Sequence, residues 1–203
     1  LGVHVSTVFR WRHAALRAIN SGDQTVLKGL VELGEVGLLY SEKGRRNLDR
    51  PARERGIWNL VKGLSARRVC VMIACDRSGS VFSNLVPHDH PFRLDLVKGV
   101  LTRVMAGATV IASKAKYSPY ASATRSLGHT YQFAPRFGVS QDELHHTLTM
   151  QRYGKLFECW LARFRGVATR YLENYLAWHR CLHMTDRQRI YWVISRTLHG
   201  CVT

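Results

Sequence analysis

Arg68-Val69-Cys70-Val71-Met72-Ile73-Ala74-Cys75 is an apolar run with the length of a buried strand. Asp76-Arg77-Ser78-Gly79 follows it directly and is typical of a hairpin turn, and Ser80 to Val86 then has the pattern of a second strand. The sequence therefore predicts an antiparallel hairpin here, and the other elements can be placed around it.

On either side of the hairpin, strand and helix patterns alternate. Apolar residues interrupted by glycines predict a strand within Leu27–Tyr40, and a single apolar stripe predicts a helix over Phe92–Met105. The remaining predictions are a strand at Ala108–Ala112, a helix at Tyr120–Leu127 stopped by Gly128, a strand at His129–Phe133, and helices from about Gln141 onward. This order predicts an α/β fold, a mixed sheet with flanking helices, and it is the order of the ribonuclease-H-like fold.

Three regions follow from these patterns. We expect residues 25–180 to form the ribonuclease-H-like domain and residues 181–203 a helical extension, with Ile190, Trp192, Val193 and Leu198 on its apolar face. Residues 1–20 predict a turn at Gly2 and a helix capped by Ser6, with Val8, Trp11 and Leu16 inward and Thr7, Arg10 and Arg17 outward. This segment resembles the second half of a helix-turn-helix, and an ordinary amphipathic helix is the alternative.

The chain is strongly basic. It has 30 Lys and Arg against 14 Asp and Glu, a net charge of +16, and the segment from Lys43 to Arg68 alone carries nine of the basic residues. Because lysine and arginine neutralise phosphates and release counterions, double-stranded DNA is the partner we expect. No apolar run is long enough to span a bilayer, so we expect no membrane association and a cytoplasmic, nucleoid-associated location.

The cysteines do not suggest a metal ribbon or a disulfide framework. There are five, none forms a CxxC pair, and their apolar neighbours are those of small buried side chains. His88-Asp89-His90 could be a metal pair, but without a third ligand nearby a surface loop is the preferred interpretation.

Several stretches carry a resemblance to a known family. The block from Trp160 to Trp178 reads W-L-A-R-F-R-G-V-A-T-R-Y-L-E-N-Y-L-A-W, and upstream stretches of the same kind lie at Arg50–Gly56, Ile73–Gly79 and Leu1–Leu16. In these blocks the chain resembles insertion-sequence transposases of the ISXO type, which are bacterial DD(E/N) enzymes with a ribonuclease-H-like fold. The family's zinc ribbon and the first half of its helix-turn-helix have no counterpart here, so the resemblance implies an N-terminally truncated relative.

The resemblance implies DNA transposition, in which two Mg²⁺ ions held by acidic side chains cleave and join DNA strands. The three family ligand positions fall at Gly34, at Lys114 or Ala115, and at Gln151. None of these residues is acidic, so we expect no intact catalytic site, no bound metal and no cofactor in this chain. Glu32 and Glu35 are the acids that could rescue the first position, although Glu35 should point to the opposite face of the strand.

Other residues are candidates for contacts with DNA rather than for chemistry. His145-His146 lies where the family has a Tyr-His pair, so it either borders the old site or lies on a helix surface. The aromatic residues Trp160, Phe164, Tyr171, Tyr175 and Trp178 could stack on bases, but their helical spacing favours a core role. The candidate DNA-binding residues are Ser6, Thr7, Arg10, Arg12, Lys43, Arg45, Arg46, Arg53, Arg163, Arg165 and Arg170.

Two functions are compatible with these features. One is a transposase-family protein whose nuclease centre is lost. Such a protein could form a homo-oligomer on DNA. The alternative is a non-enzymatic DNA-binding or regulatory protein derived from a transposase, and a basic RNA-binding domain is disfavoured because no aromatic strand motif of that kind is present.

Overall fold

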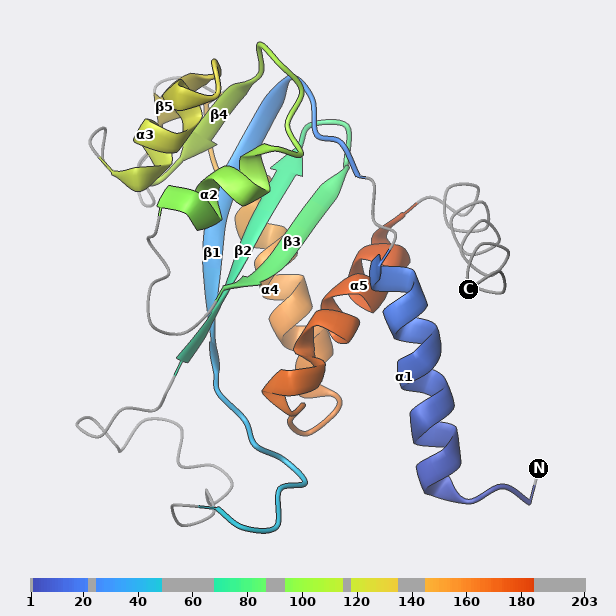
Figure 1. The fold of residues 1–203 in the computed structure, drawn as a ribbon. Helices are drawn as coiled ribbons and strands as arrows, with labels where there is room; N and C mark the ends of the chain where they lie inside the picture. Colours follow the sequence, from blue (N-terminus) through green and yellow to red (C-terminus); the bar gives the residue numbers. More distant parts are fainter. Residues whose placement is uncertain are drawn as a thin grey trace.

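The computed structural model describes residues 2–21, 25–48, 68–86, 94–114, 118–134 and 145–184. The elements in chain order are α1 (Val5–Ser21), β1 (Leu30–Leu39), β2 (Arg68–Asp76), β3 (Val81–Val86), α2 (Leu94–Leu101), β4 (Thr109–Ala112), α3 (Pro119–Ser126), β5 (Thr130–Phe133), α4 (Leu148–Ala162), a 3-10 turn (Thr169–Tyr171) and α5 (Leu172–His183). Figure 1 shows these elements arranged around one sheet.

The five strands form a mixed sheet in the order β3-β2-β1-β4-β5. The predicted hairpin is confirmed, because β2 and β3 pair antiparallel with Cys75 opposite Val81. Strand β1 lies at the centre, antiparallel to β2 and parallel to β4, and β5 extends the parallel part. The prediction of an α/β fold with a mixed sheet and flanking helices is confirmed at this level.

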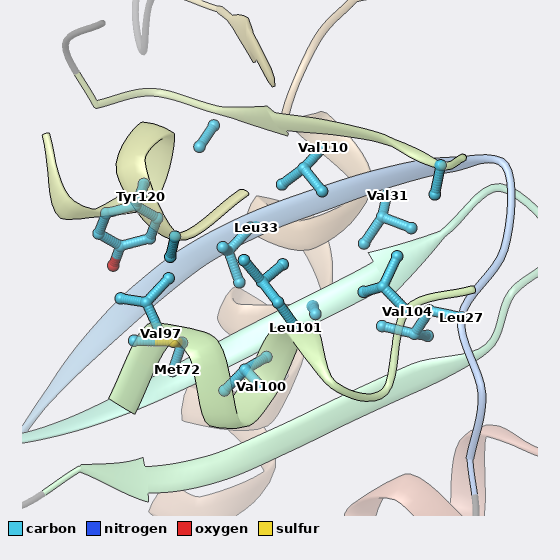
Figure 2. Packing of buried hydrophobic residues seen from close by; sticks show 14 of the residues in the cluster. Leu27, Val31, Leu33, Met72, Val97, Val100, Leu101, Val104, Val110 and Tyr120 are labelled. Atoms are coloured by element: carbon cyan, nitrogen blue, oxygen red, sulfur yellow. The ribbon is translucent and has the colours of Figure 1, made fainter. Parts of the chain in front are cut away.

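Helices cover both faces of the sheet, with α2 and α3 on one side and α4 and α5 on the other (Figure 1). On the α2–α3 face, Val31 and Leu33 of β1 pack with Leu101 and with Tyr120, as Figure 2 shows. These four side chains are buried, and burying the valine or either leucine contributes about 1.5–3 kcal/mol relative to leaving it exposed.

The α4–α5 face has its own core. Ile73 of β2, Phe157 of α4 and Leu176 of α5 are fully or almost fully buried there. Beside them, Trp160 lies with its ring 4.9 Å from that of Phe164 and 5.2 Å from that of Trp178, both edge to face. Phe164, Tyr175 and Trp178 are thus packed around Trp160, which supports a core role rather than base stacking. Tyr171 packs instead on Phe9 and His13 of α1.

The turn of the hairpin is organised by one carboxylate. Asp76 is 1% exposed, and its Oδ1 accepts hydrogen bonds from the backbone N–H groups of Ser78 and Ser80, both at 2.9 Å, and from the Ser78 hydroxyl at 2.7 Å. Its Oδ2 accepts a bond from the N–H of Lys28 at 3.2 Å. Asp76 therefore closes the turn and attaches it to the chain that leads into β1.

Helix α1 forms as predicted, but its contact face differs from the expected one. Val8 and Trp11, expected to point inward, are 51% and 59% exposed, whereas His13 is 3% exposed and Leu16 is 5% exposed. The reason is that α1 packs on α5 and on the 3-10 turn before it, where a flat ring fits. The His13 ring lies 4.3 Å from the ring of Tyr171, and its Nδ1 is 3.0 Å from the Asn174 amide nitrogen.

The start of α1 also corrects the sequence prediction. The pattern predicts Ser6 as the N-cap, but the helix already begins at Val5. The ring Nδ1 of His4 accepts the backbone N–H of Ser6 at 3.2 Å, and the His4 carbonyl accepts that of Thr7 at 2.9 Å. His4 therefore satisfies the first free N–H groups, and Ser6 lies within the first turn.

Two other helical predictions change in detail. The helix predicted over Phe92–Met105 ends at Leu101, and Val104 instead forms an isolated parallel bridge with Leu27. Leu156, expected on the apolar face of its helix, is 44% exposed because that face of α4 is centred on Phe157. The predicted extension 181–203 is described only as far as Met184, and its apolar residues Ile190, Trp192, Val193 and Leu198 lie outside the described residues.

A buried arginine connects three elements. Arg180 of α5 is 3% exposed, and its guanidinium donates to the carbonyl of Ser83 at 2.7 Å and to the Ser83 hydroxyl at 2.8 Å. The same group donates to the side-chain oxygen of Asn20 at 3.2 Å. Arg180 thus links α5, β3 and α1 through one side chain.

Within the part of the chain that the structure describes, no helix has both the length and the apolar character needed to cross a membrane.

Candidate functional site

Gly34, which the resemblance aligns with the first family ligand, lies at the centre of β1, where side chains alternate between the two faces of the sheet. Glu32 and Gly34 face α4, and Glu35 faces α3 on the other side. This confirms the expectation that Glu35 points away from the face of Gly34.

Glu32 is fully buried and held by three groups. Its Oε2 accepts the backbone N–H of Met150, at the start of α4, at 2.8 Å. Its Oε1 lies 3.1 Å from Nη1 of Arg77 and 3.5 Å from Nδ1 of His146, ion-pair distances without hydrogen-bond alignment. The carboxylate therefore has a guanidinium and a helix N-terminus as its counter-charges, an arrangement that compensates its burial.

Arg77 and His146 also contact each other. Nη1 of Arg77 is 2.9 Å from Nε2 of His146. His146 therefore lies beside Glu32, on the face of β1 that also holds Gly34. Arg77 comes from the hairpin turn and His146 from the approach to α4, so nothing in the local sequence pattern indicates that the two meet over Glu32.

Gly34 faces a space that is already filled. A Cβ at Gly34 would lie 2.0 Å from Cε and 2.9 Å from Sδ of Met150. One helical turn further on, a Cβ at Gly154 would lie 2.6 Å from Cγ2 of Val36. Two glycines, one on β1 and one on α4, thus allow the helix to approach the strand closely, and the Met150 side chain fills the space in front of Gly34.

Glu35, on the opposite face, is also paired with a cation. Its Oε1 lies 2.6 Å from Nζ of Lys114, and its Oε2 accepts the Tyr120 hydroxyl at 3.1 Å. The thiol of Cys70 donates to the same Oε2 at 3.7 Å. Burial, and then the negative charge of Glu35, raises the pKa of Cys70 to about 12 and also raises the pKa of Tyr120, so both remain protonated donors at neutral pH.

The other two family positions also lack an acidic side chain. Lys114, one of two residues aligned with the second position, points to Glu35, and Ala115, the other, lies outside the described residues. Gln151, at the third position, donates its side-chain N–H to the Thr147 hydroxyl at 2.8 Å. Its amide is therefore engaged within the first turn of α4.

These residues do not fit a pair of magnesium ions. Two ions about 3.5–4 Å apart need several converging carboxylates, but Glu32 and Glu35 lie on opposite faces and each has a lysine or arginine beside it. Among the described residues there is no group of three or more His, Cys, Asp or Glu side chains that could hold a metal ion. His88 and His90, for which the sequence favours a surface loop over a metal pair, lie outside those residues.

A second candidate site is basic and lies at the far end of β1. The chain after β1 and the connection between α4 and α5 are joined by two reciprocal bonds, in which Ser41 N–H donates to the Thr169 hydroxyl and Thr169 N–H to the Ser41 carbonyl, both at 2.8 Å. We call the predicted DNA-binding residues of these two segments the basic cluster. It consists of Lys43, Arg45, Arg46, Arg163, Arg165 and Arg170.

Local bonds hold the basic cluster in place. Nζ of Lys43 donates to the carbonyls of Phe164, Arg165 and Gly166 at 3.3, 3.3 and 2.9 Å, which satisfies oxygens just past the end of α4. Arg165 itself has a φ of 51°, in the left-handed region that non-glycine residues seldom adopt. Arg45, which is paired with Glu42, and Arg170 line one hollow between the two segments.

The predicted DNA-binding residues thus fall into two groups. The basic cluster draws six residues from two segments that are more than 100 positions apart in the sequence, and Lys43, Arg45 and Arg170 line one hollow between them. Ser6, Thr7, Arg10 and Arg12 lie on α1, where both arginines are exposed, and Arg53 lies outside the described residues. In Figure 1 the N-terminal end of α1 and the connection between α4 and α5 both lie in the lower part of the view.

No protein-family model matches the chain, and no curated protein matches it either.

Proposed function

We propose that this protein binds double-stranded DNA, that it descends from an insertion-sequence transposase of the ISXO type, and that it no longer carries out metal-dependent strand cleavage and joining. The observation that carries DNA binding is the basic cluster. Two segments distant in sequence are bonded together so that Lys43 and five arginines share one end of the molecule. Such a concentration of fixed positive charge is what a phosphate backbone requires.

The descent is supported by the sheet. Its strand order, with β1 between an antiparallel hairpin and two parallel strands, is compatible with the ribonuclease-H-like fold that the resemblance implies. The resemblance also implies that α1 is the remnant of a helix-turn-helix, and the exposed Arg10 and Arg12 are available on it for phosphates.

The loss of strand joining is supported by the centre of β1. In place of carboxylates open to a divalent ion, Glu32 is buried against Arg77 and the start of α4, and Met150 fills the space in front of Gly34. The protein therefore acts as a binding protein rather than as an enzyme. Cytoplasmic, nucleoid-associated location and assembly of several copies on DNA are parts of the same proposal.

The test is the salt dependence of binding to a duplex, measured by fluorescence anisotropy. The variant Arg46→Gln with Arg163→Gln removes two charges from the basic cluster, and we expect the slope of log K against log salt to fall by about 1 for each phosphate that is no longer neutralised. The control, Lys98→Gln with Arg125→Gln, removes two charges elsewhere and should leave the slope nearly unchanged. An equal reduction of the slope in both variants would show that only net charge matters and would refute the basic cluster as the binding site.

The same duplex, carrying candidate terminal repeats, tests the second half of the proposal. With Mg²⁺ or Mn²⁺ added we expect binding without cleaved or joined products, and removal of divalent ions with a chelator should not weaken binding. Metal-dependent joining by the wild-type protein would show that other acids hold the ions, and would overturn the proposed loss of catalysis while leaving DNA binding intact.

A further inference from the structure

Two histidines near the end of α5 face each other. His179 and His183 are four residues apart, so they lie one above the other on the same side of the helix. The Nε2 atom of His183 lies 3.2 Å from the Nε2 atom of His179, while the centres of the two rings are 4.5 Å apart. Because the nitrogens are closer together than the ring centres, both Nε2 atoms lie on the facing edges of the rings.

This spacing matches that of two ligands on one metal ion. Imidazole nitrogens lie about 2.0–2.1 Å from Zn²⁺, so two of them at adjacent corners of a tetrahedron are about 3.3–3.4 Å apart. The two Nε2 atoms are therefore within about 0.2 Å of the separation that a shared ion requires. A histidine pair at positions i and i+4 of a helix is also an arrangement that binds zinc in metalloproteases.

Three aromatic rings surround the histidine pair. The Tyr153 ring lies 4.9 Å from that of His179 and 5.1 Å from that of His183, and the rings of Phe157 and Trp160 lie 5.1 and 5.2 Å from His179. Among the described residues, no carboxylate or thiol extends the pair to a group of three ligands. Imidazole therefore has to hold the ion, which selects metals such as Zn²⁺ and Ni²⁺ over Mg²⁺ and Ca²⁺, which need oxygen ligands.

The pair is ready to accept an ion without a change of charge. Burial lowers the pKa of both histidines, so both rings are neutral at pH 7, the form that binds metals. His179 is 2% exposed, and its Nδ1 has no hydrogen-bond partner among the described residues, so Nε2 is the nitrogen placed for a ligand. The ring that carries its proton on Nε2 moves it to Nδ1 when the ion binds, and no proton is released. His183 is exposed and forms the outer side of the pair.

We propose that His179 and His183 bind one divalent transition-metal ion of the Zn²⁺ or Ni²⁺ type through their Nε2 atoms, with water in the remaining positions. The ion joins the last two turns of α5 and stabilises the folded chain, because the paired nitrogens exist only in the folded state. With two protein ligands the site is weaker than a structural zinc site with four. It is separate from Glu32 and from the basic cluster, and it does not depend on the proposed function.

The probe is the ion alone, Zn²⁺ or Ni²⁺, titrated into the metal-free protein by isothermal titration calorimetry. We expect the wild type to bind one ion that His183→Ala and His179→Phe each bind at least about tenfold more weakly, because either change leaves one ligand. His183 is exposed and phenylalanine keeps a ring at residue 179, so both variants should fold, which circular dichroism checks. The control, His88→Ala with His90→Ala, removes another closely spaced histidine pair and should bind like wild type.

Thermal unfolding gives a second readout. Zn²⁺ or Ni²⁺ should raise the unfolding temperature of the wild type but not that of His183→Ala, and Mg²⁺ at the same concentration should raise neither. The proposal is overturned if no ion binds at concentrations up to about 1 mM, or if His183→Ala binds and is stabilised like wild type. It is also overturned if the His88 and His90 control loses the ion, because the ion then lies elsewhere on the chain.

Discussion

The side chain of Met150 occupies the space in front of Gly34: a Cβ at residue 34 would lie 2.0 Å from its Cε. Replacing Gly34 by alanine restricts the unfolded chain, which stabilises by about 0.4–1 kcal/mol, but it forces Met150 out of a packed core, which costs about 1–3 kcal/mol. We expect Gly34→Ala to lower the free energy of unfolding by about 1 kcal/mol in urea denaturation.

Gly34→Asp should lower the free energy of unfolding considerably more, by about 3 kcal/mol or more, because it places a second carboxylate on the face that holds the buried Glu32.

Shortening the Met150 side chain gives the control for Gly34→Ala. In the Met150→Ala background the additional cost of Gly34→Ala should vanish. If Gly34→Ala causes no loss of stability in either background, the close approach of α4 to β1 is not what requires glycine here.

Arg77 is the counter-charge of Glu32, at 3.1 Å from its Oε1. Among the described residues, removing the guanidinium leaves the buried carboxylate with the Met150 N–H and His146 as its partners, so Arg77→Ala should destabilise the protein. Because the Arg77 side chain is 32% exposed, solvent screens part of the effect, and we expect about 1–2 kcal/mol.

A double-mutant cycle distinguishes this pairing from a simple loss of packing. In the Glu32→Gln background no charge remains to be compensated, so Arg77→Ala should cost less than it does in the wild type, with a coupling of about 1 kcal/mol. Equal costs in the two backgrounds would mean that Arg77 stabilises the hairpin turn for reasons unrelated to Glu32.

His179 connects stability to pH. Its ring is 2% exposed and lies 4.9 Å from the Tyr153 ring and 5.1 Å from the Phe157 ring. Burial, and then the charge of nearby His183, lowers the pKa of His179 to about 3 from its ordinary 6.5. The neutral ring therefore stabilises the fold fully above pH 6.5, and this contribution is lost as the pH falls from 6.5 through 3.

Carboxylates also titrate in that range, so the measurement is a difference. We expect the stability of the wild type to fall more steeply between pH 6.5 and pH 4 than that of His179→Phe, which keeps a ring of similar size in the same pocket. Urea denaturation at each pH gives both curves. Parallel curves would show that the histidine is not buried as a neutral ring.

The strands could be predicted from the sequence because each is a short apolar run closed by a turn signal. Arg68–Val86 and Ala108–Ala112 are examples, and the structure has strands at the positions that the sequence pattern predicts for both. The inner face of α1 could not be predicted, because that helix is apolar on two sides and the choice depends on α5, more than 150 residues away. The helical spacing of Val8, Trp11 and Leu16 is real, but tertiary packing selected His13 and Leu16.

The site was predictable in part. Alternation along a strand is local, so the opposite orientations of Glu32 and Glu35 followed from the sequence. What neutralises them did not, because Arg77, Lys114 and the start of α4 reach β1 only through the topology of the sheet. No periodic pattern carries information about such distant partners.

The single side chain of Arg180 couples α1 to the sheet. Its guanidinium holds the Asn20 amide near the end of α1 and the Ser83 carbonyl and hydroxyl on β3 at the same time. Close-packed interiors transmit displacement rather than absorb it. A displacement of α1 is therefore transmitted to the edge of the sheet, so that helix and sheet move as one body.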